Sequence, residues 1–127
     1  MVRVYPHYSD FKGHWPWKNF TPEEISCNHC GELFIDHKSM DTLQRLRSGW
    51  GPIPLSSAHR CTVHNTKVGG APQSMHLRLA FDCPMPSSLH LDFVKAAKIA
   101  GFTGTIRYPR KGFVHLDCRD KPYHGVG

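Results

Sequence analysis

Two histidines and two aspartates in the second half of the chain have the residue types and spacing of a metal site. His76 precedes Asp82 by six positions, and the segment 113–117 reads Phe-Val-His-Leu-Asp, with His115 and Asp117 two positions apart. Two imidazoles and one carboxylate are a ligand set for zinc that leaves a fourth position for water, as a hydrolytic site requires. If the strands that carry Asp82 and His115 pair side by side, we expect His76, Asp82 and His115 to bind Zn²⁺ in a hydrolase.

Asp117 is the expected general base of this site. In an extended strand His115 and Asp117 point to the same face, because successive side chains alternate. A carboxylate beside the ion could accept a proton from the bound water, whose pKa zinc lowers to about 7. The alternative is that Asp117 orients the His115 ring as a hydrogen-bond partner behind it.

The composition indicates a single basic globular domain. A chain of 127 residues can bury a core of its own, and 39% hydrophobic residues argue against disorder. The net charge of +6 suits an anionic partner such as nucleic acid, a membrane surface or an acidic cell-wall polymer. No apolar stretch approaches the ~20 residues that span a bilayer, so we expect no membrane insertion.

The N-terminal residues and the cysteines bear on where the protein works. Residues 1–8 lack the apolar segment of a secretory signal, so we expect the protein to be made in the cytoplasm without one. The cysteine count is odd, which argues against a complete disulfide framework and favours reduced thiols. We interpret Cys27 and Cys30 as a packing pair at a turn, with a minor zinc site that includes His29 as the alternative. The five cysteines are Cys27, Cys30, Cys61, Cys83 and Cys118.

Three segments have helical patterns. Thr21 followed by Pro22, Glu23 and Glu24 predicts a short helix with a capping box. Residues 37–49 carry a single apolar stripe typical of a surface helix. A third helix is predicted at about 88–100, capped by Ser87-Ser88 and ended by a glycine.

The strand patterns are shorter. Residues 79–83 are apolar enough for a buried strand, and residues 105–108 and 113–118 predict a hairpin. Residues 53–56 predict a short edge strand because Pro54 cannot donate to a sheet. Together these segments predict an α+β fold with a small, mostly antiparallel sheet and two or three helices.

Two further segments complete the expected organisation. Residues 57–75 read as a long polar loop, and a loop of this length in a compact domain is usually functional. Residues 1–20 are rich in aromatic and basic side chains and predict an irregular arm that packs on the body. Residues 21–127 would then form a single domain.

An ordered set of short motifs spans about residues 17–119. They are Asn19 to Glu24 with Cys27, Leu43-x-x-Leu46-Arg47, Ser57-Ala58-His59-Arg60, His64-Asn65, Val68 to Ala71, Ser74-x-His76 with Ala80-x-Asp82, Gly101-Phe102, Tyr108 to Arg110 and Phe113 to Asp117. This order resembles the zinc D-alanyl-D-alanine carboxypeptidase family. That family includes phage endolysins that cut L-alanyl-D-glutamate bonds in bacterial cell walls.

The resemblance implies a zinc DD-peptidase-like domain of the hedgehog and carboxypeptidase type. It implies a zinc metallopeptidase acting on the stem peptide of peptidoglycan, either as an endolysin-like endopeptidase or as a D-Ala-D-Ala carboxypeptidase. His76, Asp82 and His115 match the zinc ligands. Arg60 matches an arginine implied to hold a substrate carboxylate or carbonyl, for which a planar guanidinium is well suited. Ser74 would hydrogen-bond the substrate or shape the turn.

The chain departs from the family pattern in two ways. The separation from His76 to Asp82 is six where the family has seven, and Leu79 stands where a glycine is expected. One residue missing from a strand would turn the carboxylate to the opposite face, so either the intervening turn compensates or the site binds zinc poorly. Several relatives carry a general base where this chain has Gly112 or Phe113, neither of which transfers protons.

The expected setting is a monomer that acts on the cell wall after release in phage lysis, or on muropeptides in the cytoplasm. One alternative is a non-catalytic, zinc-containing cell-wall-binding or virion module, which the shortened spacing favours. The other is a metal-dependent nuclease, suggested by Cys27-x-x-Cys30 and by His59-Arg60-x-x-x-His64-Asn65. The chain lacks a second Cys-x-x-Cys pair, so we expect no nucleic-acid partner.

Overall fold

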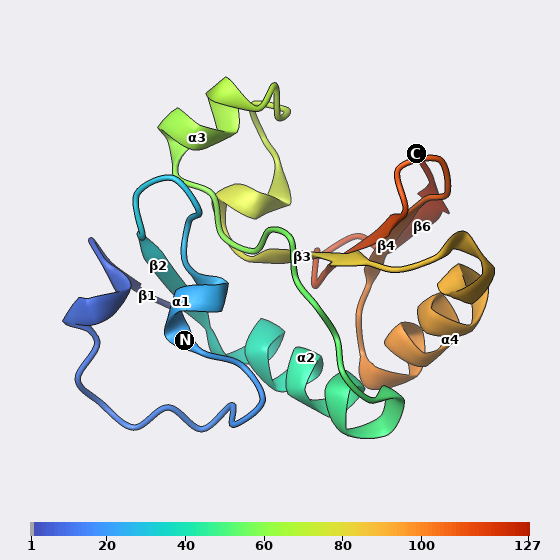
Figure 1. The fold of residues 1–127 in the computed structure, drawn as a ribbon, viewed down its shortest axis with the longest axis horizontal. Helices are drawn as coiled ribbons and strands as arrows, with labels where there is room; N and C mark the ends of the chain where they lie inside the picture. The colour runs from blue at the N-terminus through green and yellow to red at the C-terminus, as the bar shows by residue number, and fades with distance from the viewer. Residues whose placement is uncertain (1) are drawn as a thin grey trace.

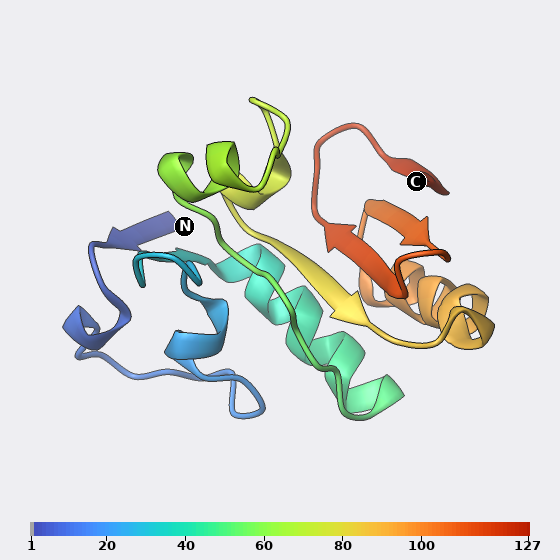
Figure 2. The ribbon, with the colours of Figure 1, turned by 45° about the horizontal axis from the view of Figure 1, so that its top comes forward.

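A four-stranded sheet and a two-stranded sheet lie on either side of a long helix, α2 (Figures 1 and 2). The computed structural model describes residues 2–127. The larger sheet has the order β3-β5-β4-β6 and is antiparallel except between β4 and β6. Its strands are β3 (Ala80–Pro84), β4 (Gly104–Tyr108), β5 (Phe113–Asp117) and β6 (Tyr123–Val126), and the smaller sheet pairs β1 (Val2–Tyr5) with β2 (Leu33–Asp36). The predicted α+β class and mostly antiparallel sheet are confirmed.

The first α-helix begins where the sequence predicts it, at a capping box. Thr21 caps the first helix in both directions, because its hydroxyl accepts from the Glu24 N–H while the Glu24 carboxylate accepts from the Thr21 N–H. The predicted helix at 37–49 is confirmed as α2. The helices are α1 (Pro22–Ile25), α2 (His37–Trp50), α3 (Thr62–Lys67) and α4 (His90–Ala100), and the 3₁₀ turns are η1 (Tyr8–Asp10), η2 (Met75–Leu77) and η3 (Ser87–Leu89). No helix within residues 2–127 is long and apolar enough to cross a membrane.

One hydrophobic core joins the elements. Helix α4 packs against β4 and β5, and α2 packs against both α4 and β2. The core side chains of α2 follow the predicted stripe, and the sheet contributes the inward residues of β3 and β5. Fully buried members include Met40, Leu43, Phe81, Phe93, Val114 and Leu116. This core fixes β3 against β5, the two strands that carry the predicted metal ligands.

Several expectations about elements are wrong. Residues 53–56 form no strand, and the neighbouring Ser57 makes only an isolated bridge with Asp82. The long loop contains the helix α3, which has a single buried residue and so no apolar stripe to reveal it. Ser87-Ser88 lies inside η3 and provides no side-chain cap for α4.

The N-terminal segment differs from the irregular course expected for it. β1 pairs in antiparallel register with β2, a strand that the sequence patterns did not predict. The rings of Trp17 and Phe20 are buried in the core, and the Trp15 indole donates to the Phe20 carbonyl. The aromatic residues therefore serve as anchors for this segment.

Candidate metal centre

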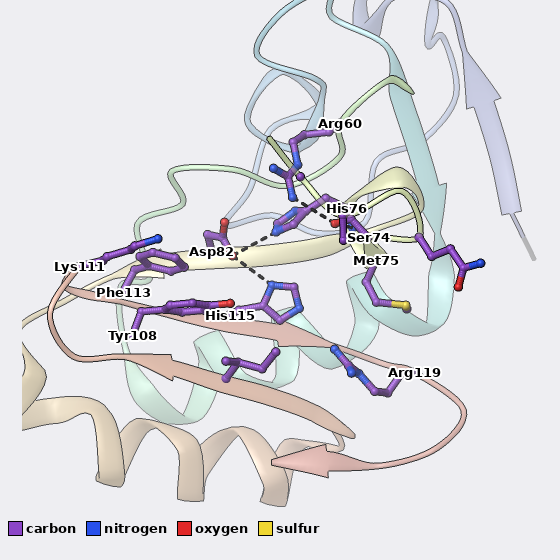
Figure 3. A pocket seen from close by; sticks show the side chains of 14 residues that line it. Arg60, Ser74, Met75, His76, Asp82, Tyr108, Lys111, Phe113, His115 and Arg119 are labelled. Carbon is purple, nitrogen blue, oxygen red and sulfur yellow. Dashed lines mark hydrogen bonds and ion pairs between the residues drawn. The ribbon is translucent and has the colours of Figure 1, made fainter. Parts of the chain in front are cut away.

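Three predicted ligands meet at the outer edge of the large sheet (Figure 3). Asp82 on β3 pairs directly with His115 on β5, so both side chains stand on the same face at the same level. His76 comes from η2, just before β3 begins. One donor atom from each residue lies within 4.8 Å of the other two. The residues chosen from the sequence as metal ligands are thus brought together.

The turn before β3 accounts for the shortened spacing. The Ser74 hydroxyl accepts from the His76 N–H at 3.2 Å and caps η2, and Arg78 then reverses the chain at φ −107° and ψ −105°. Leu79 is only 2% exposed and belongs to the core, as a glycine could not. Because the missing residue falls in this turn and not in the strand, the β3 register and the direction of Asp82 are preserved.

Hydrogen bonds behind the two rings leave one nitrogen of each facing Asp82. His76 Nδ1 donates to the Ala58 carbonyl at 2.6 Å, and His115 Nε2 donates to the Asp117 carboxylate at 2.7 Å. The opposite nitrogens, His76 Nε2 and His115 Nδ1, lie 3.1 and 3.2 Å from the same oxygen, Asp82 Oδ1. Unless both rings carry a second proton, three lone pairs converge there, and a shared cation satisfies them. The donor set therefore fits zinc.

The charges of the centre are stabilised by these contacts. Burial alone would raise the pKa of the Asp82 carboxyl, but hydrogen bonds from His115 and His76, when these rings are protonated on both nitrogens, hold it well below its usual range. Burial would lower the pKa of His115, yet its bonds to Asp117 and Asp82 raise it overall. Asp82 is accordingly ionised throughout the neutral range.

Asp117 lies behind His115 and does not line the cavity. Its side chain is fully buried, and besides His115 it accepts from Arg119 through Nε at 2.8 Å and Nη2 at 2.6 Å. These bonds outweigh burial and hold the pKa of Asp117 well below its usual range. Both carboxylate oxygens already accept hydrogen bonds, so this geometry suits a residue that orients His115. It does not suit a general base that faces the substrate.

A cavity of about 490 Å³ opens over the three ligands. Arg60 lies on its wall, and its Nη2 donates to the Ser74 hydroxyl at 3.1 Å (Figure 3). The buried Arg60 Nε has no hydrogen-bond partner among the described residues, and burial lowers the pKa of this guanidinium. The two residues expected to bind substrate thus stand together beside His76.

Three cavity residues were missed by sequence reasoning. Tyr108, Lys111 and Arg119 line the side of the cavity formed by β4 and β5. Tyr108 stacks on Phe113 with ring centroids 4.5 Å apart, and its hydroxyl points toward the ligands (Figure 3). Burial, followed by the negative charge of Asp82, raises the pKa of Tyr108, which keeps it a hydrogen-bond donor. The sequence signal that could have indicated Tyr108 was its position in the predicted hairpin, opposite Phe113 and close to His115.

Comparison with known families agrees with this geometry. A family model described as Peptidase M15 matches residues 18–117, which include every residue of the metal centre. No curated protein matches the chain. The matched region runs from just before α1 to the end of β5, so β1 and β6 lie outside it.

Proposed function

Because the chain belongs to the peptidase M15 family, a family of zinc metallopeptidases, we propose that it hydrolyses the stem peptide of bacterial peptidoglycan. The observation that carries this proposal is the convergence of His76, Asp82 and His115, with one free nitrogen of each ring directed at one carboxylate oxygen. The neighbouring cavity gives this centre room for a peptide.

The proposed ligands would hold one zinc ion through His76 Nε2, Asp82 Oδ1 and His115 Nδ1. Zinc in such a site polarises the scissile carbonyl and activates a water molecule. The chain's own contribution is to fix the ring orientations through Ala58 and Asp117. Rings held in this way lose little further freedom when the ion binds.

The basic residues of the cavity suit a substrate that carries carboxylates. Arg60, Lys111 and Arg119 line the cavity, whereas Asp82 is the one carboxylate among its lining residues. Arg60 lines the cavity and its Nη2 donates to the Ser74 hydroxyl, so the guanidinium is held in place while its cavity-facing edge binds a carboxylate or carbonyl oxygen of the peptide. This anchoring would place the scissile carbonyl over the ligands.

Tyr108 is the proposed hydrogen-bond donor to the reacting carbonyl oxygen. Its hydroxyl stays protonated because burial and Asp82 raise its pKa. A donor directed at an oxygen that gains negative charge stabilises the transition state more than the ground state. Stacking on Phe113 limits the movement of the ring.

Digestion of purified peptidoglycan tests the proposal. Zinc-loaded protein is expected to release soluble muropeptides, and their masses show whether a terminal residue is removed or an internal bond is cut. His115→Ala should abolish release, whereas His14→Ala, an exposed loop histidine, should retain it. Tight zinc binding without muropeptide release would indicate a wall-binding module and not an enzyme. Cleavage of plasmid DNA with intact peptidoglycan would point to a nuclease.

A further inference from the structure

Three cysteines form a second cluster away from the metal centre. Cys27 and Cys30 belong to the turn between α1 and β2, and Cys61 is the residue that caps α3. Their three sulfur atoms lie within 4.8 Å of one another, and none takes part in a disulfide. The thiols therefore come from two segments, and Cys30 and Cys61 lie close together although 31 positions separate them in the chain.

The backbone around the cluster is arranged to hold these sulfurs. Between Cys27 and Gly31 the chain makes a tight turn, in which the Gly31 N–H donates to the Cys27 carbonyl at 2.8 Å. Gly31 has φ +79°, a conformation that favours glycine. The Cys27 N–H donates to the Glu32 carbonyl at 2.8 Å and closes the turn. This geometry directs Cys27 and Cys30 to the same side.

Backbone N–H groups point at the sulfurs. The N–H groups of His29 and Cys61 both donate to Cys27 Sγ at 3.4 Å. The His64 N–H donates to Cys61 Sγ, also at 3.4 Å. Donors of this kind stabilise a thiolate, which is the form that binds metal. Three thiolates this close would repel one another unless a cation lay between them.

His29 is the candidate fourth ligand beside the three cysteines. Its Nδ1 lies 3.9 Å from Cys61 Sγ, and its exposed ring can turn toward the cluster. Zinc–sulfur bonds of 2.3 Å in a tetrahedron place sulfur atoms about 3.8 Å apart, so the present separations need to shrink by only about 1 Å or less. Three cysteines and one histidine are a structural zinc set that has no open position for water.

We propose that Cys27, Cys30, Cys61 and His29 bind a second, structural zinc ion. This ion fastens the start of α3 to the turn after α1. Cys61 directly follows Arg60, so the site also anchors the segment that forms the cavity wall. The cluster shares no residue with the centre at His76, Asp82 and His115, and its metal binding does not depend on peptidase activity.

Metal content of purified variants gives the first test. Protein prepared without oxygen and with excess zinc should hold about two ions per chain after gel filtration. Cys30→Ser, at an exposed position, should lose one ion, and His115→Ala should lose the other. Cys118→Ser is the matched control, because this cysteine lies outside the cluster, and it should keep both. A Cys30→Ser protein with unchanged zinc content would overturn the proposal.

Cobalt replacement tests the same site in the unaltered protein, so the result does not depend on the folding of a variant. Tetrahedral cobalt bound to thiolates gives an intense sulfur-to-metal charge-transfer band, whereas the His76–Asp82–His115 centre contains no sulfur and cannot produce one. We expect this band in wild-type protein and in His115→Ala. Absence of the band from both proteins would contradict the structural zinc site. A Cys27–Cys30 disulfide, found by mass spectrometry in protein purified under reducing conditions with zinc, would contradict it as well. If zinc is absent only from His76, Asp82 and His115, the proposed function is contradicted and the structural zinc site is not.

Discussion

Individual hydrogen bonds decide which nitrogen of each histidine is available to the ion. His76 donates from Nδ1 to the Ala58 carbonyl, and His115 donates from Nε2 to Asp117. The two ligand nitrogens are consequently of different kinds, Nε2 in His76 and Nδ1 in His115. The residue types could be read from the sequence, but this choice could not, because the acceptors come from distant segments.

Replacing Asp117 with asparagine separates its two possible roles. Asparagine lacks the negative charge that holds the His115 Nε2–H, so we expect zinc affinity to fall about 10–100-fold. Competition with a chromogenic chelator measures this affinity, and Asp120→Asn, at an exposed carboxylate nearby, serves as the control. Unchanged zinc affinity together with lost hydrolysis would instead indicate that Asp117 transfers a proton.

Replacing Arg60 with glutamine tests its contact with substrate. Loss of a charged donor to a substrate carboxylate is expected to raise KM roughly 10–100-fold, since such hydrogen bonds contribute about 1.5–3 kcal/mol. Steady-state kinetics on a purified muropeptide provide the measurement. Zinc content should stay at the wild-type level, and a variant that loses zinc with no change in KM would assign Arg60 to the metal centre.

At the level of elements, the β3–β5 pair brings the site together. The sequence patterns located both strands and the ligands on them, because buried strands and the His-x-Asp alternation are local signals. They did not decide whether the turn before β3 compensates for the shortened spacing, and they did not reveal that α3 interrupts the long loop. Those features depend on the Ser74 cap and on contacts with residues far along the chain.

The cysteine cluster also depends on contacts between distant segments, which the sequence patterns do not show. The sequence favours a packing pair at Cys27 and Cys30, because no second Cys-x-x-Cys motif accompanies them. The third sulfur comes from Cys61, which α3 places beside them. The sequence offered a zinc site with His29 only as the alternative, and the tertiary arrangement of the two elements adds the third sulfur.

Strand β4 must approach Asp117 closely, and Gly104 permits this. A Cβ at Gly104 would collide with the Asp117 carboxylate and with Arg119 Nε. Gly104→Ala is therefore expected to destabilise the fold by about 1–3 kcal/mol and to weaken zinc binding. Chemical denaturation and chelator competition measure the two effects.

Gly49→Ala is the matched control for this substitution. Gly49 lies within α2, and an added Cβ there has no neighbour within 4 Å. Alanine should leave stability unchanged or raise it by up to about 1 kcal/mol, because it favours the helix. Equal destabilisation by both substitutions would show that contact with Asp117 is not the cause.

For the whole molecule, the buried charges predict how the stability of metal-free protein depends on pH. Asp82 and Asp117 have pKa values well below those of the unfolded chain, so their stabilisation is present above about pH 4 and is lost as pH falls further. The pKa of His115 is raised, so its contribution is full below about pH 6.5 and is lost as pH rises through its folded value.

Thermal unfolding measures this profile. Metal-free protein should be most stable between roughly pH 4 and 6.5, whereas zinc should add most stability above that range, where the ligand histidines are neutral. Asp117→Asn should flatten the decline on the acid side. A metal-free protein that is most stable at alkaline pH would contradict the charge assignment.

The position of the zinc ion is tested most directly by anomalous diffraction at the zinc edge from crystals of zinc-loaded protein. We predict a peak bonded to His76 Nε2, Asp82 Oδ1 and His115 Nδ1, with the remaining coordination position open to the cavity. No peak among these three side chains, or a peak bonded to His115 Nε2 in place of Nδ1, would contradict the account.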